Sequence, residues 1–282
     1  MIIDFHTHVF PSWIKNNRDK YVDADPCFAI LYAKKEAKLA TAEELIASMD
    51  EVGIDISVIT NVGWTTHEMC VETNDYILES IARYPDRLIG FATVLPQAQE
   101  AAIAELERCA KEGVKGIGEI RPDTQLIDLT NEEIMAPFVE ALRRHNLILL
   151  THASEPVGHE YPGKGAVTPE MLYPFITRFP DLTIVCAHWG GGLPFYALMP
   201  EVKKAMDNVY FDTAASPFLY RPQIYHHVIQ LVGADKILFG SDYPLLAQSR
   251  LINEIKSLDL PEETTNLILS SNAQRLLGIK GK

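Results

Sequence analysis

The chain has few cysteines, and they lie far apart. Its 282 residues include only four, Cys27, Cys70, Cys109 and Cys186, and no two of them form a C-x-x-C pair. Zinc ribbons, dithiol redox motifs and disulfide frameworks need closely spaced cysteines, so these classes are excluded. Scattered thiols suit a reducing compartment, and we expect a cytoplasmic protein.

A basic excess and long apolar runs are also missing. There are 25 Lys and Arg residues against 38 Asp and Glu, which gives a net charge of −13. This argues against a nucleic-acid partner, because binding to phosphates usually requires a basic face. No apolar stretch approaches the roughly 18 residues that a membrane span requires. A signal peptide is not expected either, because Asp4, His6 and His8 interrupt the first apolar run and no basic segment precedes it.

The remaining composition is that of an ordinary globular protein. Hydrophobic residues make up 47% of the chain and charged residues 22%, with no low-complexity tract. The length suits one α/β barrel of about 250 residues. We therefore expect one domain, residues 1–282, with a small molecule as its partner.

Short apolar runs alternate with amphipathic stretches along nearly the whole chain. This alternation is typical of a parallel sheet covered by helices. The predicted strands are 2–8, 54–62, 88–95, 114–121, 147–152, 182–188, 208–214 and 236–242. The predicted helices are 42–52, 70–84, 97–112, 131–145, 168–179, 194–206, 222–232, 246–257 and 262–277. Eight such units predict a (β/α)8 TIM barrel.

Local signals support several helix starts. Thr41 and Thr130 are each followed by acidic residues and are predicted to be N-caps. Pro169 stands at the first helical position, where proline is favoured. One connection is unusual, because residues 9–41 form a long insertion after the first strand. The insertion is predicted either to form a lid or binding loop, or to pack on the barrel side or in a dimer contact.

Polar side chains stand where the predicted strands end, which is the face that carries active sites in barrel enzymes. His6 and His8 are two residues apart on one strand, so their side chains point to the same side. The set at the strand ends is His6, His8, Glu119, Arg121, His152, His188 and Asp242. Each has an ordinary explanation alone: a hydrogen-bonded core histidine, an aspartate that caps a helix, or a buried Glu119–Arg121 ion pair.

Together, these side chains would bring many lone pairs to one point. That is unfavourable in a partly buried site unless a cation neutralises it. Imidazoles and carboxylates without thiolates suit zinc, manganese or iron. We expect one or two divalent ions. Zinc is the expected metal, and manganese and iron are the alternatives. The candidate ligands are His6, His8, His152, His188 and Asp242, with Glu119 beside them.

This pattern resembles the amidohydrolase superfamily. The segments 187–191 (AHWGG), 239–244 (FGSDYP) and 272–277 (NAQRLL) resemble its amidohydrolase-related branch, which contains hydrolases and aminocarboxymuconate-semialdehyde decarboxylase-like lyases. The resemblance implies that His188 binds a second ion or activates the water, and that Asp242 also moves the proton. These two are the candidate catalytic residues, and the implied metal ligands are His6, His8, His152 and Asp242.

Glu119 and Arg121 distinguish two chemistries. In binuclear relatives the fourth strand supplies a carboxylated lysine or a bridging glutamate. The segment 118–120 (GEI) resembles the glutamate version of TatD-like deoxyribonucleases, whereas Lys115 lies too near the strand start. Metal binding by Glu119 would favour two ions and hydrolysis. A Glu119–Arg121 ion pair would favour one ion, and an arginine that clamps a substrate carboxylate would favour decarboxylation.

We therefore predict a metal-dependent hydrolase of a small molecule that uses metal-activated water. The alternative is a metal-dependent decarboxylase, and a barrel that binds a ligand without catalysis is a minor third hypothesis. The candidate substrate contacts are Arg121, Trp13, His159 and Tyr161. A homodimer is expected on general frequency.

Overall fold

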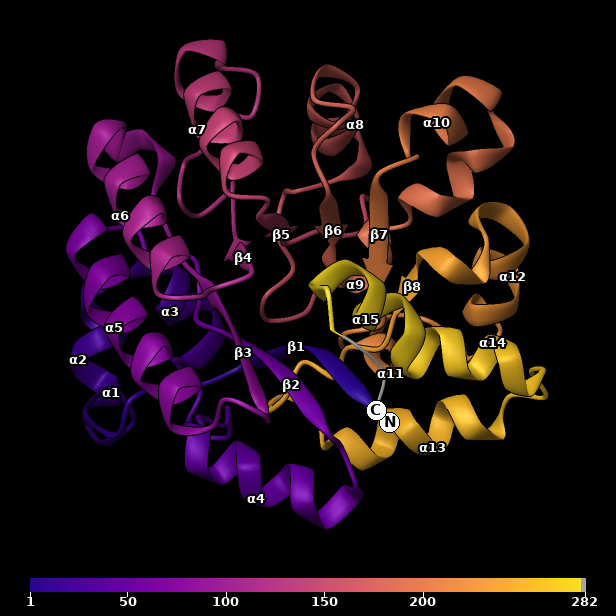
Figure 1. Cartoon of the computed structure of the whole chain (residues 1–282), viewed down its shortest axis with the longest axis horizontal. Coiled ribbons are helices and arrows are strands. Elements are labelled where there is room, and N and C mark those ends of the chain that lie inside the picture. Colours follow the sequence, from indigo (N-terminus) through magenta and orange to yellow (C-terminus); the bar gives the residue numbers. More distant parts are fainter. Residues whose placement is uncertain (280–282) are drawn as a thin grey trace.

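Eight short parallel strands follow one another around a ring, each beside the strand that precedes it in the sequence (Figure 1). The structure is a computed structural model that describes residues 1–279. The ring closes between the last and first strands, where Phe5 N donates to Phe239 O and His8 N donates to Tyr243 O, each at 2.7 Å. The predicted (β/α)8 barrel is confirmed. The strands are β1 (Ile3–His8), β2 (Ile56–Thr60), β3 (Leu88–Ala92), β4 (Gly116–Ile120), β5 (Ile148–Thr151), β6 (Ile184–Cys186), β7 (Val209–Asp212) and β8 (Ile237–Leu238).

Most strands are shorter than predicted at their carboxyl ends. The prediction continued the sixth strand to His188 and the eighth to Asp242, but both residues have left-handed backbone, with φ of 55° and 65°. A residue in that conformation cannot continue a strand ladder. The functional side chains at these two ends therefore stand on turns, just beyond the sheet.

The helices cover the outside of the ring (Figure 1). No helix within residues 1–279 is long and apolar enough to cross a membrane. The longer ones are α4 (Ala42–Val52), α5 (His67–Arg83), α6 (Glu100–Lys111), α7 (Glu132–Arg144), α8 (Pro169–Arg178), α12 (Ile224–Val232) and α13 (Gln248–Ser257). The predicted helix 194–206 is a 3-10 segment, Leu193–Leu198, followed by α10 (Pro200–Ala205), and 262–277 divides into α14 (Glu262–Asn266), a π-helical turn and α15 (Asn272–Leu277). Two short segments were not predicted: α9 (Ala187–Gly190), a turn with left-handed backbone at His188 and Trp189, and the one-turn helix α11 (Ser216–Leu219).

The predicted helix starts are only partly right. Thr41 forms a full capping box with Glu44 at the start of α4. The cap of α7 is Asn131, whose side chain accepts from Glu133 N at 3.1 Å. Thr130 donates to Asp128 instead, so the prediction for Thr130 was one residue early.

Two register shifts re-aim side chains toward the barrel axis. On β1 the pairing with β2 shifts between Asp4 and Thr7, and on β4 the pairing with β5 shifts between Ile117 and Ile120. A bulge of this kind changes which side chains face inward. Phe5 belongs to the buried cluster inside the ring, yet the next residue, His6, also faces the interior. The bulge thus separates an apolar lower layer from a polar upper one.

The insertion after β1 folds into three short helices, α1 (Ser12–Asn16), α2 (Arg18–Ala24) and α3 (Pro26–Tyr32). It has its own apolar cluster, in which Phe28 stacks on Trp64 with ring centroids 5.3 Å apart. Asp25 caps α3 and also accepts from Thr65 N at 2.8 Å, which ties the insertion to the loop after β2. The insertion packs on the barrel and, through residues 31–38, also lines the pocket described below. The insertion thus packs on the barrel and contributes to the pocket wall, whereas its roles as a lid or binding loop and in a dimer contact stay predictions.

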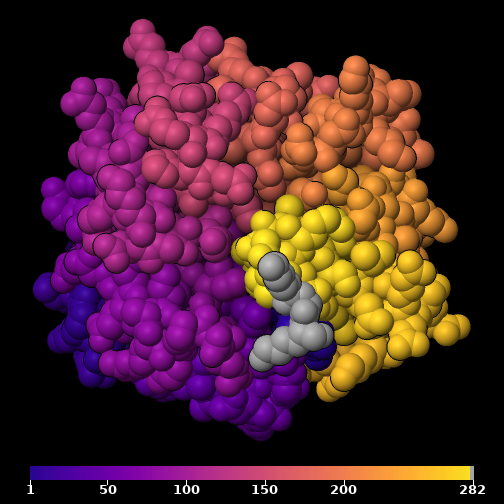
Figure 2. All heavy atoms as spheres, in the orientation of Figure 1, coloured from indigo at the N-terminus to yellow at the C-terminus, as the bar shows by residue number. Residues whose placement is uncertain are grey.

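The opposite end of the barrel is plugged. α15 lies across the centre of the ring in Figure 1, and C-terminal residues cover the same place in Figure 2. Ala273 and Leu277 belong to the cluster inside the ring with Ile3 and Phe5. Access to the polar layer is therefore from the carboxyl ends of the strands.

Gly118 lies very close to the neighbouring strand. It has φ of +138°, and a Cβ on it would lie 2.2 Å from Leu150 O on the neighbouring strand. We expect Gly118→Ala to lower the free energy of unfolding by about 1–3 kcal/mol through backbone strain and by a similar amount through the clash. The melting temperature should fall by roughly 5–15 °C, measured by calorimetry or circular dichroism.

The matched control is Gly113→Ala. Gly113 also has positive φ, +102°, but nothing lies within 4 Å of the point that its Cβ would occupy. It should therefore show the strain alone and a smaller fall in melting temperature. Equal effects of the two variants would refute the role of the close approach.

Candidate metal centre

A pocket of about 460 Å³ opens at the carboxyl ends of the strands. Its floor contains the strand-end residues predicted from the sequence, and its walls come from the insertion and from loops after β5, β7 and β8. The floor residues are His8, Glu119, Arg121, His152, His188 and Asp242. All six are at most 8% exposed, and His6 beneath them is fully buried.

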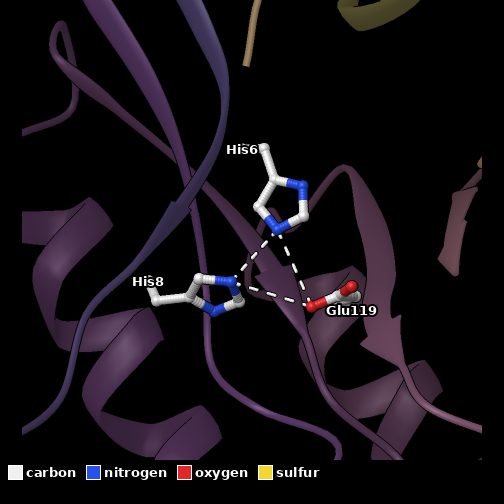
Figure 3. Close-up of side chains that lie close together, drawn as sticks. All are labelled: His6, His8 and Glu119. Carbon is white, nitrogen blue, oxygen red and sulfur yellow. Dashed lines mark hydrogen bonds and ion pairs between the residues drawn. The ribbon is translucent and has the colours of Figure 1, made fainter. Parts of the chain in front are cut away.

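Glu119 lies at the centre of the histidines. Its Oε2 is 3.7 Å from the Nε2 atoms of both His6 and His8, as Figure 3 shows. Its Oε1 is 2.9 Å from His152 Nδ1 and 3.5 Å from His188 Nε2. Each carboxylate oxygen thus faces a different pair of histidines. The same geometry gives two groups that could hold a metal ion, one with His6 and His8 and one with His152 and His188.

Partners behind the rings fix which nitrogen faces inward. A carboxylate and a carbonyl only accept, so His6 Nδ1 donates to Asp212 Oδ2 at 2.8 Å and His188 Nδ1 donates to Ala214 O at 3.1 Å. Asp212 Oδ1 also accepts from His188 N at 2.9 Å. In the neutral rings the inward Nε2 atoms therefore carry lone pairs toward Glu119. Such outward hydrogen bonds are typical of metal-ligating histidines.

This donor set fits a divalent cation. His6 Nε2 and His8 Nε2 are 3.0 Å apart and both face a buried carboxylate. Burial lowers the pKa of His6, but Asp212 and Glu119 outweigh it and raise that pKa well above its usual value. At His188, burial also lowers the pKa, but Glu119 and the nearby carboxylates outweigh it and raise the pKa to about 9. The cluster thus attracts positive charge, as protons or as a metal ion.

Asp242 lies on the pocket floor and is held there by contacts with His6 and His8 of β1. Its Oδ1 is 3.3 Å from His8 Nε2, and its N–H donates to His6 O at 2.9 Å. Burial raises its pKa, but the hydrogen bond with His8 and the nearby histidines outweigh this and lower the pKa to about 2. The neighbouring Ser241 donates through N and Oγ to the fully buried Asp4, at 2.9 and 2.6 Å. Asp242 does not cap a helix, because α13 begins only at Gln248.

Arg121 is buried beside the cluster but does not pair with Glu119. Its Nε donates to Asp123 Oδ1 at 3.3 Å and its Nη2 donates to Gly163 O at 2.5 Å. Within residues 1–279, Nη1 has no hydrogen-bond partner and Arg121 makes its ion pair with Asp123. Burial and Arg121 together lower the pKa of His152 to about 4. Glu119 lies among the histidines while Arg121 can bind an acid group through Nη1. Glu119 and Arg121 alone therefore do not distinguish hydrolysis from decarboxylation.

Of the other predicted substrate contacts, two line the pocket and one does not. His159 and Tyr161 line the pocket from the loop after β5. Trp13 packs on Tyr21 inside the insertion, with centroids 5.7 Å apart, and does not belong to the pocket lining. Asp212 orients His6 but was not predicted as a site residue, because its only signal in the sequence is its position at a strand end. Other lining residues had no sequence signal, because loop conformation places them: Leu31, Tyr32, Lys34, Lys38, Phe218 and Leu245.

Curated relatives are similar to this chain over most of its length. It is 25% identical over 341 aligned positions to 2-amino-3-carboxymuconate-6-semialdehyde decarboxylase from Dictyostelium discoideum, with 98% of this chain and 91% of the relative covered. It is also 25% identical to a gamma-resorcylate decarboxylase from a Polaromonas species, covering 81% of this chain and 84% of the relative.

A solved structure has the same fold. It is 5-carboxyvanillate decarboxylase from Novosphingobium aromaticivorans, with bound manganese and 3-methoxy-4-hydroxy-5-nitrobenzoic acid. The TM-score is 0.81 at 21% identity, with 99% of this chain and 97% of the other covered. At that identity the likeness shows the fold alone.

These findings correct the prediction of a hydrolase. The curated relatives named above are decarboxylases, which are non-hydrolytic lyases, so the main functional prediction was wrong and its stated alternative is better supported. The physical reason is that the same imidazole and carboxylate ligands serve both chemistries. A divalent-metal site is supported by the two groups of His and Glu side chains described above, whereas zinc has no specific support.

A family profile described as amidohydrolase matches residues 3–279. The match spans all eight strands and every residue of the metal cluster. The chain therefore belongs to the amidohydrolase family.

Proposed function

We propose that this protein is a metal-dependent decarboxylase that acts on a small aromatic or unsaturated carboxylic acid. The observation that carries the proposal is Arg121, buried on the pocket floor beside the metal cluster, with Nη1 unused by the part of the chain that the structure describes. A guanidinium recognises a carboxylate through paired hydrogen bonds. The decarboxylase names of the relatives support the same chemistry.

In this proposal the metal would be held by the histidines and carboxylates of the cluster, which are His6, His8, Glu119, His152, His188 and Asp242. When bound, a divalent cation supplies a Lewis acid that polarises the oxygens of the substrate and fixes its orientation. Glu119 faces one histidine pair with each oxygen, so the residues offer one position or two. Manganese is the first metal to test, with zinc and iron as the alternatives, because N and O ligands suit all three. Metal analysis of the purified protein counts the ions.

The reaction replaces a carboxylate on carbon by a proton. We assign the proton transfer to Asp242, with His188 as its neighbour on the pocket floor. The carboxyl of Asp242 gives a proton to the carbon that bears the carboxylate. The C–C bond then breaks, its electron pair returns to the ring or conjugated system, and CO2 leaves. Because the resting Asp242 is ionised, it takes up this proton from solvent as the anionic substrate binds beside it, and it returns to the ionised form after the transfer.

The remaining lining residues bind the substrate. Arg121 holds an acid group, and His159 and Tyr161 contact it from the loop after β5. Phe218, Leu219 and Leu245 give this hollow an apolar side against which a ring packs. Phe218 and Leu245 are about half exposed, so a ring that packs against them displaces water from that side of the pocket.

The test is turnover of carboxylated phenols in D2O with the manganese-loaded protein. CO2 should appear in equal amount to the decarboxylated product, measured by coupled assay and mass spectrometry. The product should carry one deuterium at the carbon that lost CO2. Lactones, amides and phosphoesters, tested beside them, should not be hydrolysed. Hydrolysis of any of these without CO2 release from the acids would refute the proposal.

A further inference from the structure

One segment of the insertion, residues 34–38, forms a wall between two hollows. Lys34, Glu36, Ala37 and Lys38 line the pocket of about 460 Å³ above the metal cluster. Lys35 and the same residues from Glu36 to Lys38 line a second hollow of about 590 Å³ on the other side. The wall therefore borders the pocket while remaining open to solvent.

Arg18 holds this wall through its backbone. Its Nη1 donates to the carbonyl oxygens of Lys34 and Lys35 at 3.1 Å, and its Nη2 donates to Ala37 O at 2.6 Å. These three contacts fix the turn that carries the lysines. Carbonyl oxygens do not neutralise a guanidinium, and Arg18 has no ion pair with a carboxylate among residues 1–279.

The wall is strongly positive in a chain that is strongly negative. Lys34, Lys35 and Lys38 are exposed, and the described part of the chain shows no ion pair for any of them. The one acid in the wall is Glu36, against four cationic side chains when Arg18 is included. The whole protein carries a net charge of −13. A local positive region at the edge of a cleft concentrates anions there, while the rest of the surface repels them.

We propose that the wall 34–38 is the capture element for anionic substrates. Lys34 and Lys38 draw a carboxylate to the pocket and pass it to Arg121 on the floor, and Arg18 is the positioning residue that keeps them there. The substrate class in this inference rests on the proposed function. The lysines are exposed and do not belong to the metal cluster, so they act on binding and leave the chemical step unchanged.

The experiment compares Lys34→Gln/Lys38→Gln with the unaltered, metal-loaded protein. At low salt kcat/KM should fall about 5–20-fold while kcat stays within about two-fold, because two charges are lost at the entrance only. The decline of kcat/KM with added NaCl should be shallower in the variant, since less attraction remains to be screened. Lys34→Arg/Lys38→Arg should restore both values.

The matched control is Lys111→Gln/Lys256→Gln. These exposed lysines lie at the C-terminal ends of α6 and α13, on the opposite face of the barrel, and have no ion pair among the described residues. The control removes the same charge, so it should leave kcat/KM within about two-fold. Arg18→Gln should raise KM with kcat unchanged.

A binding measurement separates this inference from the proposed function. Isophthalate is titrated calorimetrically into the unaltered protein and into Lys34→Gln/Lys38→Gln, at 20 and 200 mM NaCl. These concentrations lie below and above about 0.1 M, at which charges more than about 10 Å apart are largely screened. Weaker, less salt-dependent binding by the variant supports capture even where no acid is decarboxylated. Equal binding and equal salt dependence in both proteins, or no binding by either, would overturn it while leaving a decarboxylase activity intact.

Discussion

Replacement of Asp242 by asparagine is expected to reduce decarboxylation about 10²–10⁴-fold, because proton transfer by a positioned acid contributes that factor to the rate. Asparagine keeps the size of the side chain but can neither carry the proton nor offer an anionic oxygen to a cation. The polypeptide around it should remain folded, since Asp242 N still donates to His6 O and Ser241 still binds Asp4. The measurement is kcat with saturating manganese, beside a melting curve.

The control for Asp242→Asn is the same change at a buried aspartate outside the pocket. Asp25 is 3% exposed and accepts from Phe28 N and Thr65 N. Asp25→Asn keeps an oxygen that can cap α3 but replaces the oxygen that accepts from Thr65 by an amide nitrogen, so it should cost about 1–3 kcal/mol of stability and leave kcat within about three-fold. Undiminished turnover by Asp242→Asn, with a normal melting curve, would refute the assignment of proton transfer to Asp242.

Removal of the metal is the second large effect that we expect. Chelation should abolish turnover, and manganese should restore it, because the cation polarises the substrate. An ion present at about 100 to 1,000 times its Kd adds roughly 2.7 to 4.1 kcal/mol to the free energy of unfolding. The melting temperature should therefore fall by roughly 5–15 °C on chelation.

His6→Ala/His8→Ala tests whether this shift comes from the predicted centre. The double variant loses the pair that faces Glu119 Oε2 and should show little change of melting temperature with manganese. Parallel reconstitution with zinc and iron identifies which ion supports turnover. Full activity in protein that contains less than about a tenth of an ion per chain would refute the metal centre.

The fold could be predicted because its periodic signal is strong. Apolar strands such as 147–152 and amphipathic helices such as 131–145 identify themselves by pattern. The strand ends could not, because His188 and Asp242 follow an apolar run and yet adopt left-handed backbone. The register shift that turns both Phe5 and His6 inward depends on pairing with a distant strand, which a local pattern does not contain.

The candidate site was predictable in its residue types and less so in its chemistry. Histidines and carboxylates at strand ends indicate a cation, and the structure brings these side chains together around Glu119. Whether water or a bound carboxylate reacts depends on the pocket walls. Those walls are made by loops, such as the segment that carries Lys34 and Lys38, whose conformation no periodicity encodes. This is why the hydrolase prediction was wrong although its ligand set came together.

The junction of β1 and β8 has a consequence for biosynthesis. Asp4 and Ser241 are joined by hydrogen bonds although they stand 237 residues apart, and His8 meets Asp242 across the same seam. Strand β1 stays unpaired on one side until translation has passed Tyr243, whose carbonyl accepts from His8 N. The centre is therefore completed only after β8 has been made. Metal loading is delayed until that point, when the ring can close.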